Sequence, residues 1–299
     1  MYHLPVLLNE CIEGLNINPN GIYVDVTFGG GGHSKKILEH LEDGHLYAFD
    51  QDEDAKRNIP NDSRFTLIHE NFRFLKNFLR LHRVKKIDGL LADLGVSSHQ
   101  FDTPERGFST RFDGPIDGRM DQRGSITGSH ILNTYELHDL TNMFRLYGEL
   151  KNAYKISHHI IAVRETNPFE SIQGLKDSLL PLAPKFRENK FYAQVFQALR
   201  IEVNQELEAF KDMLNQCTQI MNPDGRLVIL SYHSLEDRIA KNFIKTGNVQ
   251  GDLEKDFYGK ILNEWTAVNR KPIMADEEEI EINSRARSAR LRVAKKIDK

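Results

Sequence analysis

The chain has 299 residues, of which 39% are hydrophobic and 28% are charged. This composition supports a packed core, excludes general disorder, and fits one large domain or two smaller ones. With 40 basic and 43 acidic residues the net charge is -3, so any nucleic-acid binding has to come from local basic patches.

Export and membrane insertion are not indicated. No apolar run is long enough to span a bilayer, and the N-terminus lacks the basic start and cleavage site of a signal peptide. Cys11 and Cys217 lie far apart in the sequence, which disfavours a disulfide framework and favours a reducing compartment. We therefore expect a cytoplasmic protein without a membrane partner.

The first third of the chain alternates between strand and helix patterns, which is typical of a parallel sheet with right-handed crossovers. The expected strands are 22–27, 45–49, 64–69 and 87–94, and the expected helices are 34–41, 52–58 and 72–82. Residues 95–128 then form a segment rich in Gly, Pro, Ser, Asp and Arg. A segment of this length without regular structure is more often functional than passive.

The middle of the chain shows almost only helical periodicity. The expected helices are 135–147, 150–164, 172–182 and 191–221, the last as one long helix or two abutting ones. A Pro-Asp-Gly turn at 223–225 precedes a fifth buried strand at 226–232, a helix at 234–246, and edge strands at 265–273 and 289–295. We expect an α/β fold with a mostly parallel sheet, a discontinuous sheet domain (1–105 and 217–299) and an inserted helical domain (106–216).

Four consecutive glycines at 29–32 connect the first strand to the next helix. Glycine allows close approach to the backbone, and a glycine turn at this place holds nucleotide-like cofactors in doubly wound sheets. Asp50 ends the second strand, where such folds place an acid that accepts hydrogen bonds from a ribose.

The glycine spacing does not fit a dinucleotide fingerprint. The third glycine position is Lys35 when counted from Gly30, and Ser34 when counted from Gly29. No phosphate-binding lysine motif follows. A ligand without a pyrophosphate, such as S-adenosylmethionine, fits better, and a glycine turn without a ligand is the alternative.

A second acid, Asp93, ends the fourth strand and is expected to point into the same crevice. The alternative is an N-cap, which a following Gly- and Pro-rich segment disfavours. Basic residues suited to RNA phosphates lie in two places, although both segments could also be merely solvated. They are Arg106, Arg111 and Arg119 in the long segment, and Arg285, Arg287, Arg290 and Arg292 near the C-terminus.

Several motifs in register resemble the MraW/RsmH family over nearly the whole chain. They include VDVTFGGGGHS (24–34), DLGVSS (93–98), PERGFS (104–109), FQALRIEVN (196–204) and YHSLEDR (232–238). The resemblance implies a class I, Rossmann-like methyltransferase sheet with an inserted helical domain. It implies methylation, with S-adenosylmethionine, of the exocyclic N4 amine of a cytidine in the decoding centre of 16S rRNA. The partner would be 16S rRNA, within the small ribosomal subunit, and a homodimer is compatible with this.

The same resemblance assigns a cofactor site. Gly32, His33 and Ser34 would line the methionine end, Asp50 would hold the ribose, Phe72 would pack by the adenine, and Asp93 with Gln100 would complete the pocket. The family's chemistry needs no metal, and no His or Cys set has zinc-ligand spacing.

Transfer to an amine requires alignment and a proton acceptor. Asp93 is the first candidate for the acceptor and His233 the second; the alternative for His233 is a place beside a helix cap made by Ser234 and Asp237. Two other functions remain open, a methyltransferase with another acceptor and a non-enzymatic RNA-binding or assembly protein that keeps the fold.

Overall fold

The computed structural model describes residues 5–259 and 261–298. The chain forms two compact units, a sheet unit of residues 1–95 and 207–299 and a helical unit of residues 96–206. We expected the divisions at 105/106 and 216/217. The second division falls earlier because α10 (Glu206–Ile220) buries Phe210, Met213 and Leu214 in the core of the sheet unit.

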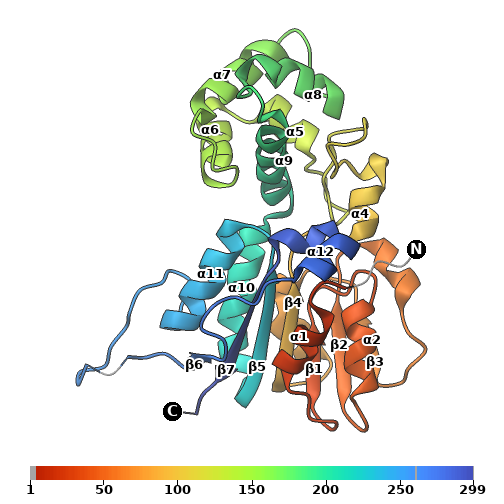
Figure 1. The fold of residues 1–299 in the computed structure, drawn as a ribbon, viewed down its shortest axis with the longest axis vertical. Helices are drawn as coiled ribbons and strands as arrows, with labels where there is room; N and C mark the ends of the chain where they lie inside the picture. Colours follow the sequence, from red (N-terminus) through yellow and green to blue (C-terminus); the bar gives the residue numbers. More distant parts are fainter. Residues whose placement is uncertain (1–4, 260, 299) are drawn as a thin grey trace. The chain divides into compact units, whose positions relative to one another are not determined.

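The sheet unit contains seven strands in the order β3-β2-β1-β4-β5-β7-β6 (Figure 1). The five parallel strands and the two C-terminal ones are β1 (Ile22–Asp25), β2 (His45–Phe49), β3 (Phe65–Ile68), β4 (Ile87–Asp93), β5 (Met221–Ser231), β6 (Trp265–Ala267) and β7 (Arg290–Lys296). β7 is antiparallel to both β5 and β6. The expected mostly parallel α/β sheet is confirmed, but β7 lies inside the sheet rather than at its edge.

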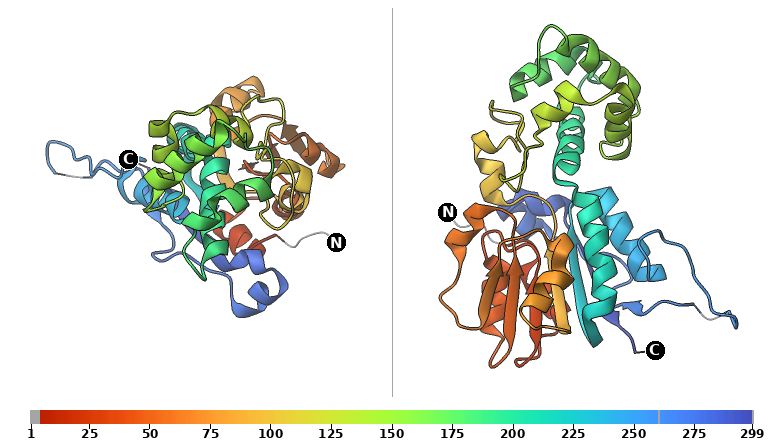
Figure 2. Two further views of the ribbon diagram at one scale, coloured as in Figure 1. Left: turned by 90° about the horizontal axis from the view of Figure 1, so that it is seen from above. Right: turned by 180° about the vertical axis from the view of Figure 1, so that it is seen from behind.

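Helices cover both faces of this sheet (Figure 2). Alternate residues of each strand point to opposite faces, so Leu227 and Ile229 join one core cluster while Val228 and Leu230 join the other. The first face carries α3 (Leu75–Leu81), α10 and α11 (Ser234–Thr246), and the second carries α1 (Leu8–Leu15) and α2 (Gly32–Glu39). The near-continuous apolar strands follow from burial on both sides.

The strand order reverses between β1 and β4, which pair directly with Asp25 opposite Leu91. Doubly wound sheets bind ligands outside the carboxyl ends of the strands at such a switch point. The fold therefore brings the glycine turn after β1 and the end of β4 to the same edge.

The helical unit has a core of its own, with Leu140, Phe144, Ile156 and Val195 among its buried residues. Its elements are α4 (Ser98–Asp102), η3 (Pro104–Arg106), α5 (Gly128–Thr134), α6 (Leu137–Leu146), α7 (Ala153–Arg164), α8 (Ile172–Leu179), η4 (Leu180–Leu182) and α9 (Glu188–Asn204). Of the two alternatives expected for 191–221, the structure shows two helices, α9 and α10, because Gln205 takes a left-handed φ of 49° that ends α9.

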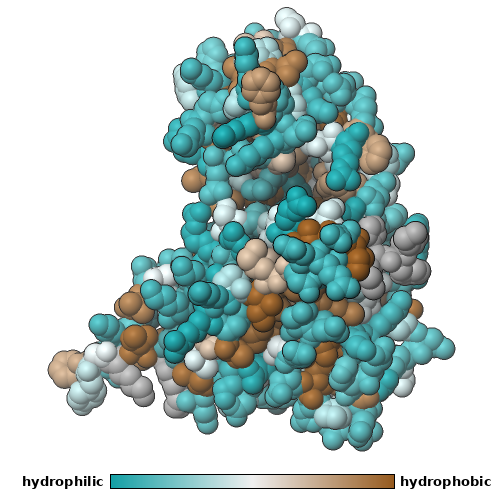
Figure 3. All heavy atoms as spheres, viewed as in Figure 1, coloured by the Kyte–Doolittle hydropathy of each residue, from teal (hydrophilic) through white to brown (hydrophobic). Residues whose placement is uncertain are grey.

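Short elements complete the chain: η1 (Glu53–Asn58), η2 (Phe72–Phe74), α12 (Glu277–Ile282) and η5 (Ser284–Ser288). Hydrophilic residues cover most of the face shown in Figure 3, with smaller apolar areas between them. None of the helices in the described ranges combines the length and apolarity that crossing a bilayer requires.

Candidate active site

The glycine turn is open at Gly30. Nothing lies within 4 Å of where a Cβ on Gly30 would be, whereas a Cβ on Gly31 would meet the Phe28 ring at 2.9 Å. Gly29 and Gly31 have φ values of 48° and 73°, a region that favours glycine. A ligand could therefore approach the backbone at Gly30 without displacing a side chain.

Gly32, expected at the methionine end, is the first residue of α2. A Cβ there would lie 2.2 Å from Cγ of Pro5, so the N-terminal segment crosses the helix start at this glycine. The close approach explains the need for glycine at position 32 without a ligand contact.

Ser34 is completely buried, and its hydroxyl donates to Oδ2 of Asp25 at 2.7 Å. Oδ1 of Asp25 accepts from the backbone N–H of Thr27 at 3.0 Å. Burial raises the pKa of Asp25, and the hydrogen bond from Ser34 lowers it. These contacts attach α2 to the end of β1, so Ser34 stabilises the glycine turn between them.

Asp50, at the end of β2, points at the same turn. Its Oδ2 accepts from the N–H of Gly29 at 2.7 Å, and its Oδ1 accepts from the N–H of Asp52 at 2.8 Å. Each carboxylate oxygen has a further lone pair that can accept a hydroxyl proton. Burial raises the pKa of Asp50 to about 6, although the two backbone hydrogen bonds lower it. This acceptor-only group suits ribose hydroxyls and disfavours a phosphate.

Asp93 ends β4, and its side chain is 24% exposed. Oδ1 accepts from the hydroxyl of Tyr232 at 2.7 Å, and Oδ2 lies 3.6 Å from Nδ1 of His33. The N–H of Asp93 donates to Oγ1 of Thr27 at 2.7 Å. Burial raises the pKa of Asp93 to about 6, although His33 and Tyr232 lower it. A carboxylate held in this way is suited to accept a proton near neutral pH.

The ring of His33 is fixed by the N-terminal segment. Its Nε2 lies 3.1 Å from the carbonyl oxygen of Val6, which can only accept, so Nε2 carries the hydrogen. When the His33 ring is neutral, its Nδ1 directs a lone pair at Asp93. A proton on Nδ1 or on the carboxyl of Asp93 would then form a hydrogen bond between the two groups. The side chain of His33 is only 7% exposed, so its ring is held in place beside Asp93.

Two other expected cofactor residues have local roles in the structure. Phe72 lies in η2 and is partly buried against the core that contains Leu75 and Leu79. Gln100 belongs to the helical unit, where it forms a capping box with Ser97 at the start of α4. Ser97, and not Asp93, is therefore the N-cap of the helix that follows β4.

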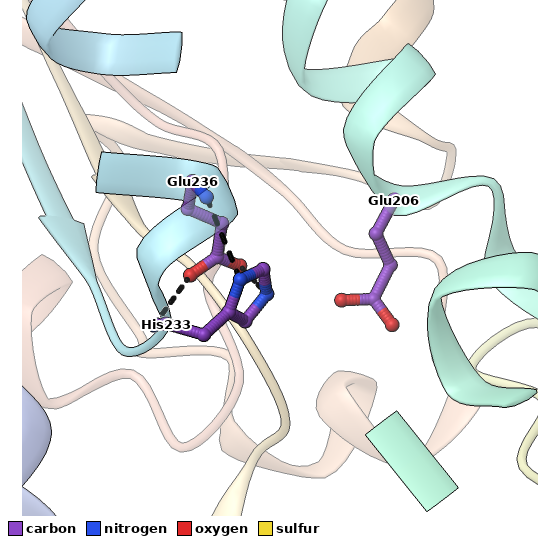
Figure 4. Close-up of side chains that lie close together, drawn as sticks. All are labelled: Glu206, His233 and Glu236. Atoms are coloured by element: carbon purple, nitrogen blue, oxygen red, sulfur yellow. Dashed lines mark hydrogen bonds and ion pairs between the residues drawn. The ribbon is translucent and has the colours of Figure 1, made fainter. Parts of the chain in front are cut away.

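His233 is the N-cap of α11. Its Nδ1 accepts from the N–H of Glu236 at 3.5 Å, and Oε2 of Glu236 accepts from the N–H of His233 at 3.4 Å (Figure 4). Nε2 of His233 also lies 3.1 Å from Oε1 of Glu236. The capping partner is thus Glu236 rather than the expected Asp237. Glu206, also labelled in Figure 4, belongs to the helical unit and pairs with Arg200 at 2.8 Å.

The basic C-terminal strand is largely neutralised within the sheet unit. Arg292 donates from Nε to Asp237 at 2.6 Å, and Arg290 lies 3.3 Å from the same carboxylate. Burial would raise the pKa of Asp237, but the two guanidinium groups outweigh it and the pKa is lowered. Lys295 pairs with Asp224 at 2.6 Å, and Lys296 pairs with Glu264.

Arg287 is exposed, and no carboxylate of the described chain lies within ion-pair distance of it. The nearby Arg285 is half-buried in η5. Of the four C-terminal arginines expected to bind RNA, Arg287 is therefore the exposed one.

Two of the three arginines of the long segment, residues 95–128, form hydrogen bonds within that segment. Arg106 is 5% exposed and donates to the carbonyl oxygens of Arg119 and Met120 at 3.1 and 3.2 Å. Arg119 donates from Nε and Nη2 to Asp117 at 2.8 and 2.7 Å. Arg111 is exposed and lies over the Phe101 ring at 5.6 Å, so it is the best placed of the three for an RNA contact.

Sequence reasoning located the acids at the strand ends but did not find Tyr232. Its position directly after β5, the strand beside β4, is the signal that could have predicted contact with Asp93. An open glycine turn and two strand-end carboxylates at the switch point are typical of a Rossmann-like enzyme. Its cofactor would contain a nucleoside and no pyrophosphate.

The chain belongs to the MraW methylase family, whose model matches residues 1–297. It is 55% identical over 296 residues to ribosomal RNA small subunit methyltransferase H of Bacteroides thetaiotaomicron, covering 99% of this chain and 97% of that protein. The protein of the same name from Amoebophilus asiaticus is 56% identical over 297 residues, covering 99% and 96%. An rRNA methylase structure from Streptococcus thermophilus matches with a TM-score of 0.39 at 13% identity, covering 97% of this chain and 94% of that one.

Proposed function

We propose that this chain transfers a methyl group from S-adenosylmethionine to the exocyclic N4 amine of a cytidine in 16S rRNA, within the small ribosomal subunit. The observation that carries the proposal is the carboxylate of Asp93 at the end of β4, held between Tyr232 and His33 at the same sheet edge as the open glycine turn. The whole-chain similarity to ribosomal RNA small subunit methyltransferases supports the same substrate.

The residues present fit this cofactor. Asp50 would hold the ribose hydroxyls with the lone pairs that Gly29 and Asp52 leave available. The backbone at Gly30 would border the methionine part. When bound, S-adenosylmethionine supplies a methyl carbon already activated by a sulfonium, so the protein needs no covalent intermediate.

The main task of the protein is to align the amine. Alignment of this kind can supply roughly 7–11 kcal/mol in favourable cases. Asp93 would accept a hydrogen bond from the amine and then the proton that the amine loses. A carboxyl with a pKa of about 6 is mostly ionised at neutral pH and can therefore act as an acceptor.

Tyr232 and His33 would orient Asp93, because each lies against a different oxygen of its carboxylate. Tyr232 does so from the end of β5, and His33 from α2. His233 is less suited to the acceptor role, since its Nδ1 caps α11 and its Nε2 is buried 3.1 Å from Oε1 of Glu236. We therefore assign proton acceptance to Asp93 and helix capping to His233.

The test is methylation of small subunits from cells that lack this chain, with labelled S-adenosylmethionine and mass spectrometry of the nucleosides. We expect labelled N4-methylcytidine from 16S rRNA. Asp50→Ala should weaken cofactor binding more than about tenfold in calorimetry, because a charged acceptor is lost. Asp54→Ala, which removes a nearby acid that pairs with Arg57, is the matched control. Wild-type protein that binds no S-adenosylmethionine would contradict the proposal and favour a non-enzymatic role.

A further inference from the structure

A tight turn of the helical unit exposes an aromatic ring almost completely. The N–H of Arg187 donates to the carbonyl oxygen of Pro184 at 3.0 Å and closes the turn. Phe186, in the third position, is 96% exposed and has a φ of 64°. The turn lies directly before α9.

This conformation is unfavourable for phenylalanine. A positive φ at the third position of a turn normally calls for Gly or Asn, because a Cβ crowds the backbone there. The N–H of Phe186 donates to Oε1 of Glu188 at 3.0 Å, which helps to hold the geometry. Strained positions of this kind concentrate at functional sites. Neither the strain nor the exposed ring stabilises the helical unit, so both point to a role in binding.

The charges around the ring are positive and available. Lys185, Arg187 and Lys190 are all exposed, and within the described part of the chain none has a carboxylate partner at ion-pair distance. The carboxylate of Glu188 is the one acid among residues 184–190. This arrangement differs from the C-terminal strand, whose basic residues are paired internally.

A second exposed phenylalanine provides the contrast. Phe257 in the sheet unit is 97% exposed, but residues 252–258 around it carry three acids, Asp252, Glu254 and Asp256, against one lysine, Lys255. Acidic neighbours repel a polyanion, whereas the neighbours of Phe186 attract one. Exposure alone does not distinguish the two rings, but the surrounding charge does.

We propose that the Phe186 turn binds a single-stranded segment of the RNA substrate. An unpaired base would stack on the Phe186 ring, and Lys185 and Arg187 would contact the flanking phosphates. Sites of this type combine aromatic rings with cations and tolerate different bases. The inference rests on the proposed function for its RNA, but the binding step can be measured without methyl transfer.

The experiment measures binding of the full chain to a fluorescein-labelled single-stranded RNA of ten nucleotides, by anisotropy at several salt concentrations. Phe186→Ala should weaken binding about tenfold, and Phe186→Trp should retain it. Phe257→Ala is the matched control and should have no effect. The double change of Lys185 and Arg187 to Gln should reduce the slope of log affinity against log salt by about 1.4, since each phosphate contact contributes about 0.7.

Phe186→Gly separates binding from folding. Glycine relieves the positive φ, so the unfolding temperature should stay equal or rise while RNA binding falls. A lower unfolding temperature would indicate a structural role and overturn the proposal. RNA affinity unchanged in Phe186→Ala, or reduced equally in Phe257→Ala, would also overturn it. In that case, wild-type protein that still methylates small subunits would leave the proposed function intact.

Discussion

Replacing Asp93 by Asn should stabilise the protein at neutral pH while removing methyl transfer. Folding raises the pKa of this carboxyl from 3.8 to about 6, so the folded state disfavours the ionised form. Two pKa units correspond to about 3 kcal/mol, at about 1.4 kcal/mol per unit. Because the side chain is 24% exposed, we expect a smaller gain of about 1–2 kcal/mol in the free energy of unfolding at pH 7.

The size of this effect depends on pH. A folded pKa above the unfolded value imposes no penalty below about pH 3.8, where both states are protonated. The penalty of wild-type Asp93 develops as pH rises from about 4 to 6 and is complete above that range. Urea unfolding at about pH 4 and pH 7 should therefore show a difference between Asp93→Asn and wild type that grows with pH.

Asp62 provides a control of opposite sign. The hydrogen bonds from Arg64 lower its pKa to about 2, so its carboxylate stabilises the folded state above its unfolded pKa of 3.8. Asp62→Asn should therefore reduce stability at pH 7. If Asp93→Asn also reduced stability at pH 7, or if its effect were the same at both pH values, the contacts of Asp93 would outweigh its burial and our reasoning would be refuted.

Three further predictions concern single contacts. Tyr232→Phe removes a hydrogen bond that lowers the pKa of Asp93. In the pH profile of the methylation rate, the rise on the acid side should therefore move about one pH unit towards alkaline pH. A profile that does not move would contradict this role of the contact. Arg292→Gln breaks the pair with Asp237 and should lower the unfolding temperature without changing the salt dependence of RNA binding. If the cofactor binds ionised Asp50, whose pKa is about 6, its affinity in calorimetry should fall about tenfold from pH 8 to pH 5. An affinity that does not change with pH would argue against the ribose assignment.

Long periodic elements were predictable from the sequence. The strand at 45–49 and the helix at 234–246 have the expected bounds, because alternation and helical spacing are unbroken there. The helices at 98–102 and 128–134 were missed, since one or two turns give too little periodicity. The break at Gln205 was also unpredictable in position, because a left-handed helix end normally uses glycine.

The sequence predicted those residues of the site that lie at the ends of single strands. Asp50 and Asp93 follow from the rule that ligands bind at the carboxyl ends of parallel strands. Their partners depend on contacts distant in sequence, such as Tyr232 with Asp93, which lie 139 residues apart. The run of basic residues near the C-terminus predicted phosphate binding. In the structure Arg290 and Arg292 pair with Asp237, which is distant in sequence, so the charge pattern alone could not reveal this pairing.

The two acids of the site share a physical property that connects stability with function. Burial raises the pKa of both Asp50 and Asp93 to about 6, and hydrogen bonds from backbone or side chains offset that only in part. The sheet unit therefore holds two carboxylates whose ionisation is less favourable than in the unfolded chain, at the edge where a cofactor with a positive sulfonium is expected. A cation bound there would favour their ionised forms, as an opposite charge does for any buried acid. The unfavourable ionisation of these two buried acids and their expected affinity for a cationic ligand thus have the same cause.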